Sequence, residues 1–185
     1  MIFVTVGSQM PFDRLIGTVD RWAQSRGRDD VFAQIGETNR QPAHIQWTSR
    51  LTPAAFNHRT RDAAVVVAHA GMGAILTALT LGKPIIVLPR LGALRETRND
   101  HQVATATQLA AMGKVHAAFN EQELEALLDQ ADTLSASEPL PVAASPALIQ
   151  TIRRFICQDV VHGIQEQDQP NCEKNHPCGA SMTNE

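Results

Sequence analysis

The sequence predicts an α/β fold, a Rossmann-like and mainly parallel sheet with helices on both faces. Short apolar segments alternate along the chain with segments whose apolar residues recur at helical spacing, as in βαβ units. Segments 63–67 and 85–88 contain no polar residue, which is typical of strands that are buried on both faces of a parallel sheet. Gly and Pro residues beside these segments supply the turns.

The first part of the chain provides three predicted strands and two predicted helices. Residues 1–6, 31–35 and 44–47 are short apolar segments of the strand type. Residues 11–26 have apolar side chains at helical spacing, and a shorter helix is predicted over 51–58. The order of these elements is the alternation that a parallel sheet requires.

The central stretch, residues 63–113, is the part around which the chain is organised. A glycine turn, His69-Ala70-Gly71-Met72-Gly73, separates strand 63–67 from a helix that ends near Leu81, and strand 85–88 follows. Ligands of open parallel sheets bind outside the carboxyl edge, and the amides at a helix N-terminus suit a phosphate. The stretch therefore predicts a βαβ unit that binds a phosphate or diphosphate.

The elements after this unit complete the predicted domain. A polar loop, 90–101, leads into a helix over 99–112, an edge strand over 114–118 and a helix over 121–131. We therefore expect one ligand-binding domain that ends near residue 131.

The composition changes after this domain. Residues 132–146 are rich in Ser, Ala and Pro and are predicted to be a linker. Residues 147–162 have the spacing of a C-terminal helix. The rest, 163–185, is polar with hardly any apolar residue, so we expect a disordered tail.

Composition and charge exclude several classes of function. The net charge is −3, only 4% of residues are aromatic and Tyr is absent, so nucleic acid is not an expected partner. No segment has the roughly 18 to 20 consecutive apolar residues that a membrane span requires, and the N-terminus lacks the features of a signal peptide. We therefore expect a cytoplasmic protein.

The cysteines are placed too near the C-terminus to staple the domain. Cys172, His176 and Cys178 provide one ligand fewer than a structural zinc site unless Cys157 or His162 joins them, and their spacing fits no familiar zinc module. We expect no bound metal.

Three segments carry a resemblance to a known family. They are MIFVTVGSQMPFDRLI, VFAQIG and AHAGMGAILTALTLGKPIIVLPRLGALRETRNDHQVATATQLAAMG. Together they resemble the C-terminal domain of family 28 glycosyltransferases over about residues 1–118. The chain is similar in particular to the small catalytic subunits of bipartite exopolysaccharide transferases, the PssE type, and to their eukaryotic counterpart in lipid-linked oligosaccharide assembly.

This resemblance implies the donor-binding half of a GT-B glycosyltransferase. The implied reaction is inverting transfer of a hexose or hexuronic acid from a UDP-sugar to a lipid-diphosphate-linked acceptor, without metal or cofactor. The implied partner is a membrane-anchored, acceptor-binding subunit that holds this chain at the inner face of the membrane. The length agrees, because a cleft between two domains of about 100 to 200 residues each requires a longer chain than this one.

The glycine turns provide the first candidate site residues. Gly71, Met72 and Gly73 would bring backbone amides to the donor diphosphate, although a tight turn for packing is the alternative. Gly7 and Ser8 end the first strand and either face the same cleft or form a plain turn. His69 could hydrogen-bond phosphate or sugar hydroxyls and is a candidate catalytic residue, although the base in a GT-B enzyme commonly comes from the other domain.

The loop and helix after strand 85–88 provide further candidates. In the family a His-Gln pair, here His101 and Gln102, contacts the donor, and Asn99 either does the same or caps the helix. Arginines in this loop either neutralise the diphosphate or an acidic sugar, or are solvated. These arginines are Arg90, Arg95 and Arg98.

The sequence departs from the family at one functional position. Many family members carry a Glu that holds the ribose hydroxyls, and Thr77 stands there instead. Thr cannot hold two hydroxyls as a carboxylate does, so either Glu96 substitutes or the ribose is held otherwise. The alternative functions that remain open are a UDP-sugar epimerase-like enzyme and a non-catalytic UDP-binding or scaffolding module.

Overall fold

The computed structural model describes residues 1–38, 40–139 and 146–165, the last segment with side chains up to Phe155. The chain divides into two compact units, Met1–Val142 and Ala143–Glu185. The first unit contains the sheet and helices α1 to α5, and helix α6 (Pro146–Gln165) belongs to the second.

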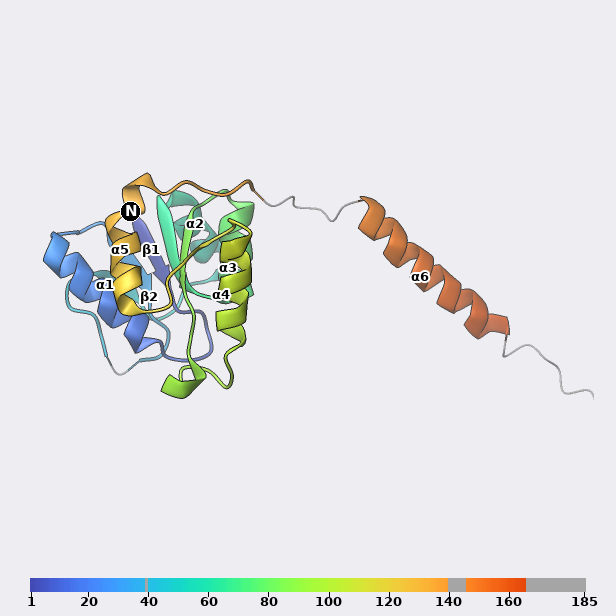
Figure 1. Cartoon of the computed structure of the whole chain (residues 1–185), viewed down its shortest axis with the longest axis horizontal. Helices are drawn as coiled ribbons and strands as arrows, with labels where there is room; N and C mark the ends of the chain where they lie inside the picture. Colours follow the sequence, from blue (N-terminus) through green and yellow to red (C-terminus); the bar gives the residue numbers. More distant parts are fainter. Residues whose placement is uncertain (39, 140–145, 166–185) are drawn as a thin grey trace, which may run out of the picture. The chain divides into compact units, whose positions relative to one another are not determined.

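The sheet has six strands, and every neighbouring pair is parallel (Figure 1). The order is β3-β2-β1-β4-β5-β6, which confirms the predicted Rossmann-like α/β class. The strands are β1 (Ile2–Thr5), β2 (Val31–Gln34), β3 (Gln46–Thr48), β4 (Val65–His69), β5 (Ile85–Leu88) and β6 (His116–Ala117). The strand order reverses between β1 and β4, and ligands bind at the carboxyl ends of strands at such a reversal.

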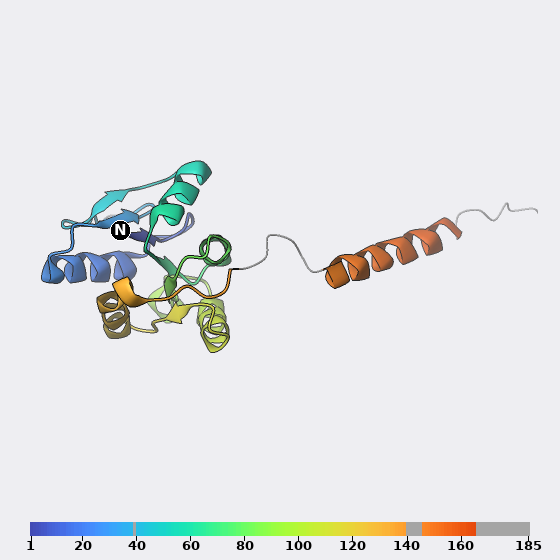
Figure 2. The ribbon, with the colours of Figure 1, turned by 90° about the horizontal axis from the view of Figure 1, so that it is seen from above.

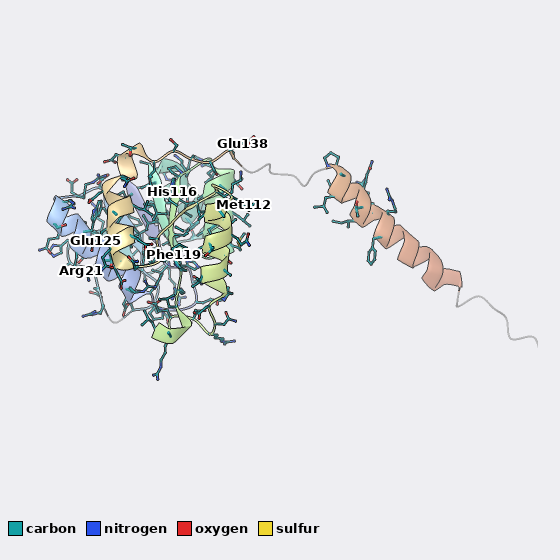
Figure 3. The ribbon with its side chains drawn as sticks, in the orientation of Figure 1. Arg21, Met112, His116, Phe119, Glu125 and Glu138 are labelled. Atoms are coloured by element: carbon teal, nitrogen blue, oxygen red, sulfur yellow. The ribbon has the colours of Figure 1, made fainter. Side chains whose placement is uncertain are left out.

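Helices cover both faces of the sheet, as Figure 2 shows from above. They are α1 (Asp13–Arg26), α2 (Pro53–Asp62), α3 (Met72–Thr80), α4 (His101–Ala111) and α5 (Glu121–Asp129). One buried cluster joins alternate strand residues to α1 and α5, for example Val4 and Val67 to Leu15 and Leu124. These two helices lie side by side, and Figure 3 labels Arg21 and Glu125 on them.

The second buried cluster joins the other strand residues to α2, α3 and α4, and Phe3 lies at its centre. The Phe3 ring meets Phe56 of α2 edge-on, with 5.4 Å between the ring centroids. Because successive strand residues face opposite sides, each central strand contributes to both clusters. This explains why β5 and the first four residues of β4 are continuous apolar runs.

Two boundaries differ from the predictions for identifiable reasons. Strand β3 begins at Gln46 instead of residue 44, because the amides of Ala43, His44 and Ile45 donate to the Asp20 carboxylate over 2.8 to 3.2 Å. Helix α2 ends at Asp62 instead of residue 58, so β4 is displaced toward the glycine turn and ends at His69. His69, a predicted site residue, is therefore the last residue of β4.

Helix α6 corresponds to the helix predicted over 147–162. The predicted tail begins at residue 163, whereas α6 continues to Gln165, and the remainder of the tail with its Cys172, His176 and Cys178 lies outside the described residues. None of the helices in the described part of the chain is long and apolar enough to cross a membrane.

Candidate functional site

A cavity of about 810 Å³ lies at the carboxyl edge of the sheet. Its walls come from the ends of β1, β2, β4 and β5, from the segment after β3, and from the first turns of α2, α3 and α4. Nine of the predicted site residues line it: Gly7, Ser8, His69, Gly71, Met72, Gly73, Arg90, His101 and Gln102. Its volume is within the range of pockets that bind nucleotide-sized ligands.

The first turn of α3 presents free backbone donors to this cavity. Gly71 is the N-cap and has no side chain to satisfy the amides of the first turn. The amides of Met72, Gly73 and Ala74 have no acceptor among the described residues. A Cβ atom at Gly73 would meet no protein atom within 4 Å, so a ligand can approach this amide closely. The site can therefore bind an anion through amides and the helix dipole.

The imidazole of His69 is packed between two glycines. A Cβ atom at Gly71 would lie 2.0 Å from Nε2 of His69, and one at Gly7 would lie 2.6 Å from Cε1. Gly7 also has a φ of +79°, a conformation that other residues rarely adopt. Both glycines are thus required by the histidine and by the local backbone, whatever ligand the cavity binds.

His69 is held as a neutral side chain. Burial and the positive charge of Arg90 lower the pKa of the His69 imidazole to about 4. Its Nδ1 atom is buried and has no partner in the part of the chain that the structure describes. His69 lines the cavity as a neutral imidazole, and with this pKa it is a weak general base at neutral pH.

Arg90 lines the cavity, but its guanidinium is committed to the protein. Nη2 donates to the carbonyl oxygens of Val6 and Met10 over 2.8 and 2.7 Å, and Nη1 donates to those of Pro11 and Glu96 over 2.6 and 3.2 Å. The residue is 4% exposed. The predicted direct role of Arg90 in charge neutralisation does not fit this geometry, since its Nη donors hold the β1–α1 loop that carries Gly7 and Ser8.

Gln102 connects this arginine to the cavity. Its Oε1 atom accepts a hydrogen bond from the Arg90 amide over 3.2 Å. Its Nε2 atom has no partner among the described residues and is available to a ligand. His101 is more exposed, and its Nδ1 atom contacts Oδ1 of Asn99.

Three other predicted residues of this region do not line the cavity, namely Arg95, Arg98 and Asn99. Glu96 and Thr97, which stand between Arg95 and Arg98 in the same loop, do line it. The amide of Gly92 donates to Asp100 over 2.7 Å, and Arg95 adopts a left-handed conformation with a φ of 57° after the short 3-10 helix Gly92–Leu94.

Glu96 is also engaged by the protein. Arg14 donates to both of its carboxylate oxygens over 2.8 Å, and the Leu91 amide donates to Oε2 over 2.9 Å. Both partners of this ion pair are about one-tenth exposed. The suggestion that Glu96 replaces the family's ribose-binding Glu therefore conflicts with its observed contacts. Thr77 lines the cavity and donates to the Gly73 carbonyl over 2.8 Å.

The sequence reasoning missed a buried polar group beneath the cavity. Gln34, the last residue of β2, accepts a hydrogen bond from Thr5 over 2.6 Å and donates to the carbonyls of Gly7 and Ser49 over 3.0 and 3.2 Å. It thereby fixes the carboxyl ends of β1 and β3. A Gln that ends an apolar strand was the available signal.

The other missed residues are Glu37, Arg50 and a wall around Phe56. Glu37 and Arg50 form an ion pair at the cavity, and both are exposed. Leu51, Pro53 and Phe56 supply apolar surface beside them. No signal in the sequence identified this side, because it depends on the order of β2 and β3 in the sheet.

No group of three or more His, Cys, Asp or Glu side chains that could hold a metal is found among the described residues. The polar groups that the cavity offers to a ligand are backbone amides, neutral side chains and one exposed ion pair, because the charged groups of Arg90 and Glu96 are held by the protein. This donor set suits an anionic organic ligand.

The fold and the cavity define a Rossmann-like domain that binds its ligand at the carboxyl edge. The glycosyltransferase family 28 C-terminal domain matches residues 1–149, and the chain belongs to this family. A comparison with curated protein sequences finds no match.

Similar solved structures come from glycosyltransferases. The kitacinnamycin glycotransferase is 20% identical with a TM-score of 0.50, over 71% of this chain and 34% of that one. MurG of Acinetobacter baumannii is 18% identical with a TM-score of 0.52, over 72% of this chain and 45% of that one. ALG13 is 20% identical with a TM-score of 0.54, over 81% of this chain and 93% of that one. At these identities the likeness concerns the fold, and the chain spans less than half of the first and second of these proteins.

Proposed function

We propose that this chain is the donor-binding catalytic subunit of a two-component UDP-sugar glycosyltransferase. The proposal is based on the cavity of about 810 Å³. Residues with free amides at the start of α3 line this cavity, and so does the neutral His69. Membership of family 28 supports a sugar nucleotide as the ligand. The UDP-sugar is a substrate, and the proposal includes no further cofactor.

The diphosphate is assigned to the amides of Met72 and Gly73. These donors are fixed before the ligand arrives, and the positive end of the α3 dipole lies at the same point. In transfer, an acceptor hydroxyl oxygen forms a bond to the anomeric carbon while the bond from that carbon to the diphosphate oxygen breaks. Negative charge then grows on the leaving UDP, where preorganised amides are most effective.

The remaining cavity residues are assigned to the rest of the donor. Gln102 Nε2 has no described protein partner and is free to hydrogen-bond the diphosphate or the sugar, and His69 lines the same cavity. The apolar wall of Leu51, Pro53 and Phe56 is suited to the uracil ring. We assign His69 to binding and leave the proton of the acceptor hydroxyl to a base on another polypeptide, because a pKa of about 4 makes His69 a weak base.

The second component is proposed to carry the acceptor. The chain covers about a third of the kitacinnamycin glycotransferase and 45% of MurG, and our proposal assigns the acceptor-binding half of such a protein to a partner. We propose a membrane-anchored subunit that presents a lipid-diphosphate-linked acceptor and holds this chain at the cytoplasmic face, in exopolysaccharide or glycolipid synthesis.

Reconstitution tests this assignment. The purified chain is expected to bind UDP and to transfer no sugar, and co-expression with an acceptor-binding membrane subunit is expected to give transfer from a UDP-sugar to a lipid-linked acceptor. Transfer by the purified chain alone would contradict the two-component assignment. Interconversion of UDP-sugars without any acceptor would indicate an epimerase, and absence of UDP binding would indicate a scaffolding module.

A further inference from the structure

Two arginines line the cavity, and they differ in what their guanidinium groups are free to do. Arg90 is buried and donates four hydrogen bonds to backbone carbonyls. Arg50 follows β3, and its side chain is 73% exposed. Arg14 lies nearby on α1 but is held by Glu96. Arg50 is therefore the arginine among the described lining residues whose guanidinium can turn toward a ligand.

The partner of Arg50 is a single exposed carboxylate. Nη2 of Arg50 contacts Oε1 of Glu37, whose side chain is 80% exposed. Water competes strongly for both groups of such a pair, so the pair adds little to stability. An arriving oxyanion can displace the carboxylate at small cost, and a guanidinium can donate two parallel hydrogen bonds to a phosphate or carboxylate.

Glu37 also affects an anionic ligand directly. It lines the same cavity, and its negative charge would repel a diphosphate if Arg50 did not offset it. His69 and Arg90 supply no mobile positive charge, since His69 is neutral at pH 7 and Arg90 is fixed. Beyond the amides at the start of α3, the attraction that side chains can offer an anion thus depends on Arg50, and the Glu37 carboxylate opposes it.

From this arrangement we infer that Arg50 recognises the negative charge of the ligand and that Glu37 holds Arg50 while the cavity is empty. The recognised group is an oxyanion, either the diphosphate or a carboxylate on an acidic sugar. The inference rests on the proposed function, because it takes a UDP-sugar as the ligand of the cavity. It assigns to Arg50 the role that the sequence suggested for Arg90.

Calorimetric titration of the full chain tests the inference with uridine, UDP, UDP-glucose and UDP-glucuronate. Arg50→Gln is expected to weaken binding of the recognised anion about tenfold and to leave uridine unchanged. Glu37→Gln is expected to tighten binding of the same ligand by a few fold. Arg61→Gln is the matched control, since Arg61 is an exposed arginine of α2 that does not line the cavity.

The ligand arms identify the anion. A loss that appears with UDP assigns Arg50 to the diphosphate, and a loss confined to UDP-glucuronate assigns it to the sugar carboxylate. If the wild type binds UDP and UDP-glucuronate and Arg50→Gln binds both with unchanged affinity, the inference about Arg50 is wrong and the proposed function still stands. If the wild type binds none of the four ligands, the proposed function fails and the inference fails with it.

Discussion

Gly71 and Gly73 stand two residues apart in one turn, and the structure gives them different tasks. A side chain at Gly71 would collide with the His69 ring, whereas a side chain at Gly73 would enter open space in the cavity. The same division extends over the site. Its inner wall, which we define as Gly7, His69, Gly71 and Arg90, is occupied by contacts within the protein. Its outer wall, which we define as Glu37, Arg50 and Gly73, is open to a ligand.

A glycine or an arginine can therefore occupy a position in this site for either of two physical reasons. In the inner wall, the glycines and Arg90 are needed for contacts within the folded protein. In the outer wall, Gly73 and Arg50 are not needed for folding, since Gly73 faces open space and Arg50 makes an exposed ion pair. Substitutions in the inner wall should therefore reduce stability, and substitutions in the outer wall should change ligand binding without reducing stability. Paired substitutions in the two walls test this difference.

Arg90→Met is expected to destabilise the domain by about 4 kcal/mol, because several carbonyls lose their donors and a buried unsatisfied polar group costs about 1 to 3 kcal/mol. The matched variant Arg50→Met should change the unfolding free energy by less than about 0.5 kcal/mol, since it removes an exposed pair. Urea unfolding measures both. Equal stability of the two variants would remove the distinction between the walls.

The pH dependence of stability tests the buried imidazole of His69. Its folded-state pKa of about 4 is below the usual value of 6.5, so the unfolded chain binds this proton more readily. Stability contributed by the neutral imidazole is present above pH 6.5 and is lost as the pH falls toward 4, by about 3 kcal/mol in all. Urea unfolding at several pH values should show this slope in the wild type, and His69→Gln should remove it between pH 6.5 and 4. The same slope in His69→Gln would contradict burial of a neutral imidazole.

Gly71→Ala is expected to cost about 2 kcal/mol of unfolding free energy, because overpacking of a filled site costs roughly 1 to 3 kcal/mol. Gly73→Ala provides the control and should cost less than about 1 kcal/mol, since its new methyl group meets nothing. The double substitution His69→Ala with Gly71→Ala should be less destabilised than the sum of its parts, because the first change removes the collision. Additive effects would show that the ring does not determine the choice of glycine at position 71.

Much of the fold followed from local patterns in the sequence. Ile85–Leu88 agrees with its prediction residue for residue, because an apolar run buried on both faces has no competing local structure. The start of β3 did not follow, because the Asp20 carboxylate on a distant helix takes the amides of His44 and Ile45. Boundaries that depend on such long-range hydrogen bonds cannot be predicted from short-range patterns.

The site was predictable where the chain itself brings residues together. The glycine turn follows β4, and the His101-Gln102 pair begins the helix that comes after the neighbouring strand β5. The partners of Arg90 were not predictable, because Val6 and Met10 are 84 and 80 positions away along the chain. Arg50 and Glu37 were missed because the sequence pattern does not reveal the sheet order, which places β2 beside β1 and β3 beside β2.

The proposed function depends most directly on the free amides in the first turn of α3, to which we assign the diphosphate of a UDP-sugar. Calorimetric titration with UDP, with the unfolding free energy measured in parallel, tests this assignment on the wild type, Gly73→Val and Gly17→Val. Gly17 is a helical glycine of α1 outside the cavity and serves as the matched control. Gly73→Val is expected to remain folded and to bind UDP with at least tenfold lower affinity. Gly17→Val is expected to bind UDP as the wild type does. Unchanged UDP affinity of a folded Gly73→Val chain would contradict this assignment.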